Sequence, residues 1–118
     1  MTNVLVVEDD RAIARVLELR LANSGYDVTL AHDATTAATV ASHCSPQIAL
    51  LDISMPGGDG FEVAECLRTL YGDRIDLIFL TASHREDVRR RAISYGPMAY
   101  FAKPFSAEEL LATLAGAV

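Results

Sequence analysis

Five short apolar runs recur along the chain, and longer segments of mixed polarity separate them. Each run is nearly continuous instead of alternating, which is typical of strands buried on both faces of a parallel sheet. The runs are Val4–Val7, Val28–Ala31, Ile48–Leu51, Leu77–Leu80 and Ala99–Ala102. They predict five strands joined by right-handed crossover connections.

The segments that follow the runs have the spacing and the end signals of helices. In the first segment, four apolar residues share one helical face: Ile13, Val16, Leu17 and Leu21. Asp33 can cap the second helix, and Ser106 with Glu109 forms a capping box at the start of the last. We expect helices over residues 11–24, 33–43, 60–70, 84–95 and 106–116.

Alternating strands and helices indicate an α/β fold, a doubly wound parallel sheet with helices on both faces. We expect a single domain over residues 1–118, because 118 residues is a usual domain size. No apolar run approaches the roughly 18 residues that cross a membrane, and no secretory leader precedes the first strand. The expected location is therefore the cytoplasm, without membrane partners.

Composition narrows the classes of partner. Hydrophobic residues make up 51% of the chain, enough for a sizeable core. Sixteen acidic residues against ten Lys and Arg give a net charge of −6, which argues against direct nucleic-acid binding by this domain. Cys44 and Cys66 lie in separate predicted helices without metal-ligand spacing, so we expect free thiols.

Candidate chemistry gathers where the predicted strands end. In open α/β sheets, ligands bind beyond the carboxyl ends of the strands. Those ends carry Glu8, Asp9 and Asp10, then Asp52, then Thr81 and Ala82, and finally Lys103. If the first and third strands are neighbours, carboxylates about 4 Å apart repel by roughly 4 kcal/mol at an effective dielectric of about 20. Such repulsion predicts a bound cation. For Asp10 the simpler interpretation is a cap of the first helix.

The residue types suit magnesium and phosphoryl transfer. Mg²⁺ takes octahedral oxygen ligands, so Asp9 and Asp52 could bind it directly and Glu8 through water, with Mn²⁺ as an alternative ion. The backbone carbonyl of Ser54 could complete the set. A carboxylate such as Asp52 is also a nucleophile that accepts a phosphoryl group as an acyl phosphate. Lys103 can neutralise charge on that group.

Four motifs occur in order along the chain and carry a family resemblance. They are Val4-Leu5-Val6-Val7-Glu8-Asp9-Asp10, Leu51-Asp52-Ile53-Ser54-Met55-Pro56-Gly57-Gly58-Asp59-Gly60, Leu80-Thr81-Ala82 and Tyr100-Phe101-Ala102-Lys103-Pro104-Phe105. Together they resemble the receiver domain of two-component response regulators, similar to chemotaxis regulators, over the whole chain. The resemblance implies a flavodoxin-like strand order 2-1-3-4-5.

The resemblance also implies a role for each site residue. Asp52 would be the phosphoacceptor, and Glu8 and Asp9 the acidic pocket that holds Mg²⁺. The phosphoryl-binding residues would be Thr81, Ala82 and Lys103. Thr81 and Tyr100 would form the switch, and a cis peptide bond would precede Pro104.

Partners follow from the same resemblance. A histidine kinase or histidine phosphotransfer protein would donate the phosphoryl group. The surface of the fourth helix, fifth strand and fifth helix would then address an output protein or a fused effector domain. The chain would be a monomer or a weak phosphorylation-dependent homodimer, and it would be either a stand-alone receiver or the N-terminal part of a longer regulator. Self-phosphorylation from a donor and self-dephosphorylation would be its only catalysis.

Two other classes of protein remain as alternatives to a receiver domain. A small phosphatase could use Asp52 as a turnover nucleophile, although no substrate-binding insertion is evident. A phosphorylation-independent interaction module is the other alternative.

The sequence departs from the family pattern before the switch aromatic. The segment Gly96-Pro97-Met98-Ala99 lacks the acidic residues that many relatives carry there, which puts a charged dimer face in doubt. Arg85, Arg89, Arg90 and Arg91 form either a solvated helix face or part of a partner surface.

Overall fold

A computed structural model describes residues 2–55 and 60–116 of the chain. It contains a five-stranded sheet in which every neighbouring pair is parallel, in the order β2-β1-β3-β4-β5. The predicted fold class and strand order are both confirmed. The strands are β1 (Asn3–Val7), β2 (Asp27–Ala31), β3 (Ile48–Asp52), β4 (Asp76–Thr81) and β5 (Ala99–Ala102).

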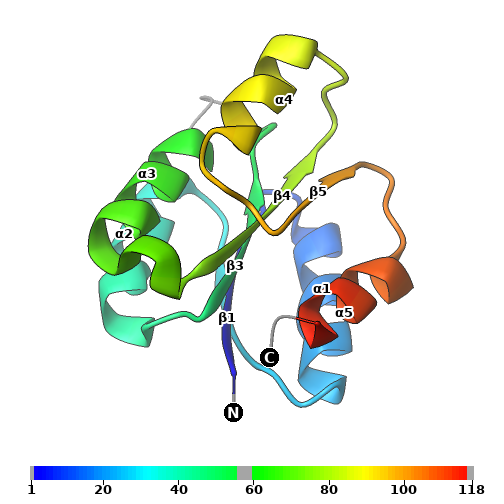
Figure 1. Cartoon of the computed structure of the whole chain (residues 1–118). Helices are drawn as coiled ribbons and strands as arrows, with labels where there is room; N and C mark the ends of the chain where they lie inside the picture. Colours follow the sequence, from blue (N-terminus) through cyan, green and yellow to red (C-terminus); the bar gives the residue numbers. More distant parts are fainter. Residues whose placement is uncertain (1, 56–59, 117–118) are drawn as a thin grey trace.

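Helices cover both faces of this sheet (Figure 1). They are α1 (Arg11–Asn23), α2 (Ala34–Cys44), α3 (Gly60–Tyr71), α4 (Glu86–Ile93) and α5 (Ala107–Ala115), with a short 3₁₀ turn η1 (Gly72–Arg74) that the sequence did not predict. One face packs against α1 and α5, whose Leu17, Leu21, Leu110 and Leu114 enter its core. The other face packs against α2, α3 and α4.

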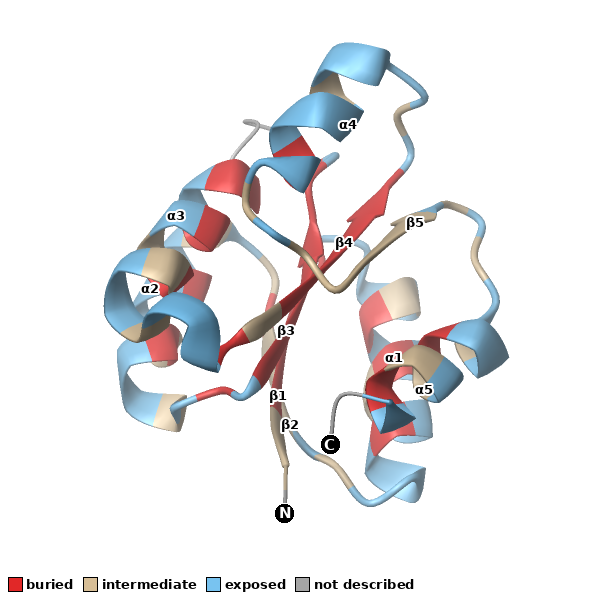
Figure 2. Ribbon diagram, viewed as in Figure 1, coloured by how far each residue is buried: buried red, intermediate tan, exposed pale blue. Residues whose placement is uncertain are grey.

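Burial distinguishes the central strands from the edge strands (Figure 2). β3 is buried throughout, and β1 and β4 are buried except at their first residues. The edge strands β2 and β5 are mostly half-buried. Burial on both faces therefore holds for the three central strands and only partly for β2 and β5.

Side-chain caps fix where the helices begin. Asp10 accepts hydrogen bonds from the amides of Ala12 and Ile13 at 2.9 and 3.1 Å, so its predicted role as a cap is confirmed. Asp33 accepts one from Thr36 at 2.7 Å, and Ser106 accepts one from Glu109 at 3.2 Å. These caps satisfy free amides in the first turn, so each helix can begin directly after a strand end or a loop.

One apolar residue predicted on the buried face of the first helix lies at the surface instead. Val16 of α1 is 54% exposed. Ala14, Leu17 and Leu21 make the buried stripe of α1, so Val16 falls on its flank. Among the described helices, none combines the length and apolar character needed to cross a bilayer.

Candidate functional site

The sheet register brings the polar strand ends together. Val7 pairs with Leu51 between β1 and β3, so the next residues, Glu8 and Asp52, are neighbours at one edge. Asp52 in turn pairs with Leu80 of β4, one residue before Thr81. Thr81 pairs with Ala102 of β5, which places Lys103 at the same edge. The four strand ends converge there as the sequence predicted.

A buried ion-pair triad forms the centre of this edge. The ammonium of Lys103 lies 2.7 Å from Oε1 of Glu8 and 3.0 Å from Oδ2 of Asp52. The Glu8 and Asp52 side chains are 0% and 1% exposed, and that of Lys103 is 15% exposed. Two carboxylates share one ammonium, so the triad carries a formal surplus of negative charge when all three groups are ionised.

The surroundings drive the pKa values of the two carboxyls apart. Burial, then the hydrogen bond to Asp52, raises the pKa of Glu8 to about 8, against 4.5 for an ordinary glutamate. Burial alone would also raise the pKa of Asp52, but hydrogen bonds from Glu8, Ser54 and Lys103 hold it below its ordinary value. Asp52 is therefore the carboxylate that stays ionised, and a nucleophile has to be in that form.

The acidic residues of this edge fit a small divalent cation. Glu8, Asp9 and Asp52 each offer a carboxylate oxygen, and these oxygens all lie within 4.8 Å of one another. Oε1 of Glu8 is buried, and the positive charge beside it in the described residues is the ammonium of Lys103 at 2.7 Å. Asp9 is exposed and leaves the group open to water. A hard cation that keeps several waters suits this donor set.

Ser54 contacts the carboxylate of Asp52 with two donors. Its amide and its hydroxyl both donate to Oδ1 of Asp52, at 2.8 and 2.6 Å. The amide of Ala82 donates to the same hydroxyl oxygen at 3.3 Å. The sequence predicts Ser54 beside the pocket, with its backbone carbonyl as a metal ligand, but spacing alone gives no direction for its exposed side chain.

Thr81 and Tyr100 lie on the α4 side of the edge. The Thr81 hydroxyl is buried and accepts a hydrogen bond from the Ser83 amide at 2.9 Å. Tyr100 pairs with Phe79, two residues before Thr81, so both switch candidates share one face of the sheet. Tyr100 is half-buried and lines a hollow of about 150 Å³ together with Ser83, His84, Arg85, Arg89 and Ala102.

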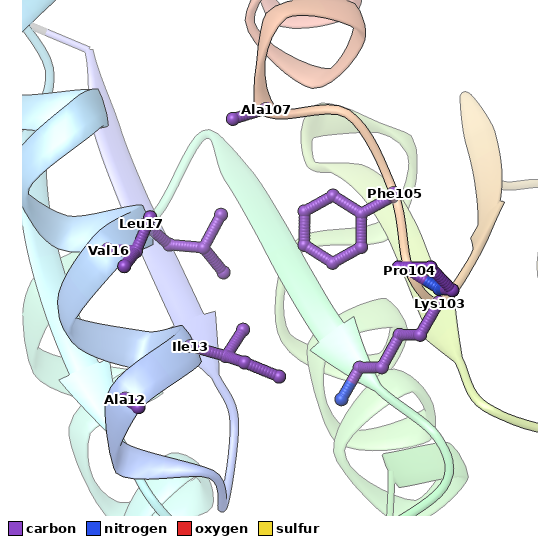
Figure 3. A pocket seen from close by; sticks show the side chains of 8 residues that line it. All are labelled: Ala12, Ile13, Val16, Leu17, Lys103, Pro104, Phe105 and Ala107. Atoms are coloured by element: carbon purple, nitrogen blue, oxygen red, sulfur yellow. The ribbon is translucent and has the colours of Figure 1, made fainter.

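An apolar groove adjoins the site on the opposite side. It has a volume of about 510 Å³ and lies between α1 and the segment that leads from β5 into α5. Figure 3 shows Phe105 pointing across it towards Ile13 and Leu17, with Lys103 at one end. The peptide bond between Lys103 and Pro104 in this wall is cis. Val16 is exposed on the rim.

Sequence reasoning missed two further neighbours of the site. Nδ1 of His32 lies 3.1 Å from the backbone oxygen of Glu8. The backbone of Gly60 packs so closely on the end of β3 that a Cβ there would lie 2.5 Å from the Asp52 carbonyl oxygen. Both contacts come from the tertiary structure. Positions 56–59 of the Asp52 motif lie outside the described residues.

Comparison with known proteins gives one family. The sequence profile of the response regulator receiver domain matches residues 4–115. The signal receiver domain of a modulated diguanylate cyclase from Desulfovibrio desulfuricans G20 is 35% identical, with a TM-score of 0.86 over 99% of this chain and 93% of that one.

Two further solved structures are similar. Vibrio cholerae chemotaxis protein CheY4 is 27% identical, with a TM-score of 0.89 over 100% of this chain and 99% of that one. A response regulator from Burkholderia pseudomallei, solved with a phosphorylated aspartic acid, a calcium ion and citrate, is 26% identical. Its TM-score is 0.87 over 97% of this chain and 66% of that one.

Proposed function

Because the chain belongs to the response regulator receiver domain family of two-component systems, we propose that Asp52 accepts a phosphoryl group from a protein phosphohistidine. The observation that supports this best is the triad. Asp52 is buried at a strand end, with a lowered pKa, beside Lys103 and two further carboxylates. The phosphorylated aspartic acid in the Burkholderia relative is in line with the proposal.

In the transfer step, a lone pair of the Asp52 carboxylate forms an oxygen–phosphorus bond while the donor's phosphorus–nitrogen bond breaks. The electron pair of the broken bond stays on the imidazole nitrogen, and the ring leaves neutral because its other nitrogen carries a proton. The product is an acyl phosphate on Asp52. Lys103 is positioned to stay paired with the enlarged anion, since its Nζ already lies 3.0 Å from Oδ2.

The acidic residues would hold Mg²⁺, or Mn²⁺ in its place. Asp9 and Asp52 would bind it directly, with the Ser54 carbonyl, and Glu8 through water. When bound, the ion supplies positive charge that offsets the phosphoryl oxygens. Calcium in the Burkholderia relative supports a divalent cation in this family.

The added oxygens give Thr81 and the Ala82 amide new acceptors at the end of β4. Thr81 then exchanges its contact with the Ser83 amide for the phosphoryl group, and Tyr100 repacks towards the end of β4. The α4–β5–α5 surface thereby changes its preference for an output protein or a fused effector domain. This is a population shift, driven by contacts that only the phosphorylated state makes.

Radiolabelled transfer from a cognate histidine kinase or phosphotransfer protein tests the assignment of Asp52. Wild type should become labelled in Mg²⁺ and unlabelled in EDTA, and Asp52→Ala should stay unlabelled. Asp73→Ala, an exposed acidic residue in η1, is the matched control and should label like wild type. Labelled Asp52→Ala would refute the proposal.

The same protein samples distinguish the competing functions. Beryllofluoride with Mg²⁺ should shift the NMR resonances of Thr81, Ala82 and Tyr100, because it imitates a phosphoryl group on Asp52. An unchanged spectrum would point to a phosphorylation-independent module. Multiple turnovers of a simple phosphomonoester that disappear in Asp52→Ala would point to a phosphatase.

A further inference from the structure

The hydroxyl of Ser54 holds two groups that phosphoryl transfer needs. It donates to Oδ1 of Asp52 at 2.6 Å, a short distance typical of a hydrogen bond to a charged acceptor. Its oxygen accepts the Ala82 amide at 3.3 Å. The hydroxyl therefore bridges the nucleophile on β3 and a backbone donor beyond β4. Among the proposed site residues, Ser54 is one of the exposed ones, so its side chain has room to leave.

Oδ1 of Asp52 has little capacity left for a reaction while this bridge exists. A carboxylate oxygen has two lone-pair sites in its plane, and Oδ1 accepts both the amide and the hydroxyl of Ser54. Oδ2 is paired with Lys103. Attack on phosphorus through Oδ1 therefore requires one of its two hydrogen bonds to open. The Ser54 hydroxyl is the partner that opens most easily, since water can replace its contacts at the exposed rim.

The Ala82 amide points to a second form of competition. In the resting protein its acceptor is an oxygen that lies beside Asp52 and belongs to Ser54. In the proposed phosphorylated state, its acceptor is an oxygen that lies beside Asp52 and belongs to the phosphoryl group. One N–H group cannot satisfy both acceptors well, because hydrogen bonds weaken steeply away from linear geometry.

We propose that the Ser54 hydroxyl is a latch on the resting site, which occupies the Ala82 amide and the Asp52 carboxylate until a phosphoryl oxygen displaces it. This inference rests on the proposed function and adds to it a positioning residue that sets how readily the site is filled. The latch uses the side chain only, so a substitution that keeps the backbone carbonyl leaves the proposed metal ligand in place.

Beryllofluoride titration in Mg²⁺ tests the latch, with the Ala82 amide resonance as readout. Ser54→Ala removes the competing acceptor and should tighten beryllofluoride binding by roughly two- to tenfold, the range expected for one net hydrogen bond. Ser54→Thr keeps a hydroxyl and should bind like wild type. Ser42→Ala is the control for loss of a serine hydroxyl elsewhere. Ser42 is exposed on α2, and within the described part of the chain its hydroxyl contacts Thr39 and the adjacent His43.

A second readout needs neither metal nor beryllofluoride. The Ala82 amide proton of Ser54→Ala should move upfield relative to wild type, since its acceptor is gone, whereas Ser42→Ala should leave it in place. An unmoved Ala82 resonance, or equal or weaker beryllofluoride binding by Ser54→Ala, would overturn the latch while leaving the proposed function standing. No beryllofluoride binding by wild type would overturn the proposed function and the latch together.

Discussion

Glu8 has a buried carboxyl group, and this burial makes the number of protons it binds depend on folding. Burial is the largest cause that raises its pKa to about 8, and the group would titrate near 4.5 once unfolding exposes it. Between these two values the folded chain keeps a proton that the unfolded chain has lost. Rising pH then favours the unfolded state.

We therefore expect the metal-free protein to lose stability as the pH rises from 5 to 7.5. The free energy of unfolding should fall by at most about 1.4 kcal/mol per pH unit, which is the value for one proton. The other resolved shifts lie outside this window, because Asp33, Asp52 and Asp87 titrate below 3.8 and Cys44 and Lys103 above 9.0. Urea denaturation in EDTA at a series of pH values measures this free energy of unfolding. Glu8→Gln should flatten the profile, and a flat wild-type profile would contradict the expectation.

Gly60 is a residue where a single added methyl group should disturb the site through the backbone at the end of β3. A Cβ there would lie 2.5 Å from the Asp52 carbonyl oxygen and 2.7 Å from Cα of Ile53, and both are backbone atoms that cannot rotate away. Gly60→Ala should cost about 1–3 kcal/mol of stability, the usual penalty for overpacking. Urea denaturation gives the value. Gly116→Ala, whose nearest contact would be 3.5 Å, should change stability little, and equal effects of the two variants would contradict the packing argument.

At the scale of elements, Arg68 of α3 joins two loops that precede strands. Its guanidinium donates to the carbonyls of Tyr95 and Gly96 after α4, at 2.9 and 3.1 Å. It also donates to those of Gly72 and Ile75 before β4, both at 2.7 Å. The fork of fixed N–H groups makes this set of contacts possible, and an ammonium has no such geometry.

Arg68→Lys should therefore destabilise the fold although it keeps the charge. We expect a loss on the order of 2 kcal/mol, the scale of hydrogen bonds to a charged group that have lost their donor. Arg74→Lys is the control, because Arg74 is exposed and its contacts are longer, 3.2 and 3.5 Å. Denaturation curves would compare the two, and a loss no greater for Arg68→Lys would show that the fork is dispensable.

The apolar groove beside α1 is an element-scale feature with a separate consequence. A donor protein must bring its phosphohistidine to the edge where Lys103 lies, and the groove adjoins that residue. Val16→Glu puts a charge on the rim and should slow transfer from the cognate kinase severalfold. Phosphorylation by acetyl phosphate, which needs no protein contact, should proceed at the wild-type rate. A loss of both reactions would indicate damage to the site itself.

The same elements show what the sequence could predict. Continuous apolar runs and turn residues predicted every strand and every long helix, because those signals are local. The site residues of β1, β3, β4 and β5 were predicted because strand ends of a parallel sheet must share an edge. The sequence did not predict the half-buried edges β2 and β5, the exposure of Val16 or the hydrogen bonds of the Ser54 hydroxyl, since each depends on packing or on side-chain direction. The fourth helix begins at Glu86 instead of 84, after an extended Arg85.

For the whole molecule, the cost of gathering carboxylates links metal binding to folding. Glu8, Asp9 and Asp52 lie within reach of one ion only when β1 and β3 are paired. A cation that binds this arrangement and not the unfolded chain stabilises the fold by RT ln(1 + [Mg²⁺]/Kd). At ten times Kd the gain is about 1.4 kcal/mol, which corresponds to a rise in Tm of roughly 3–6 °C for a chain of this size.

Thermal unfolding with increasing Mg²⁺ against EDTA measures this coupling. Wild type and Asp73→Ala should show the same rise in Tm, because Asp73 lies in η1, before β4 begins, and not at the carboxyl ends of the strands. Asp9→Ala should lose most of the rise while keeping a folded baseline, since Asp9 is exposed and its removal leaves the core intact. The rise should also grow from pH 6 to pH 8, because Mg²⁺ competes with the proton that the folded protein holds on Glu8. A rise that survives in Asp9→Ala would place the cation away from these carboxylates, and the proposed Mg²⁺ site would then be wrong.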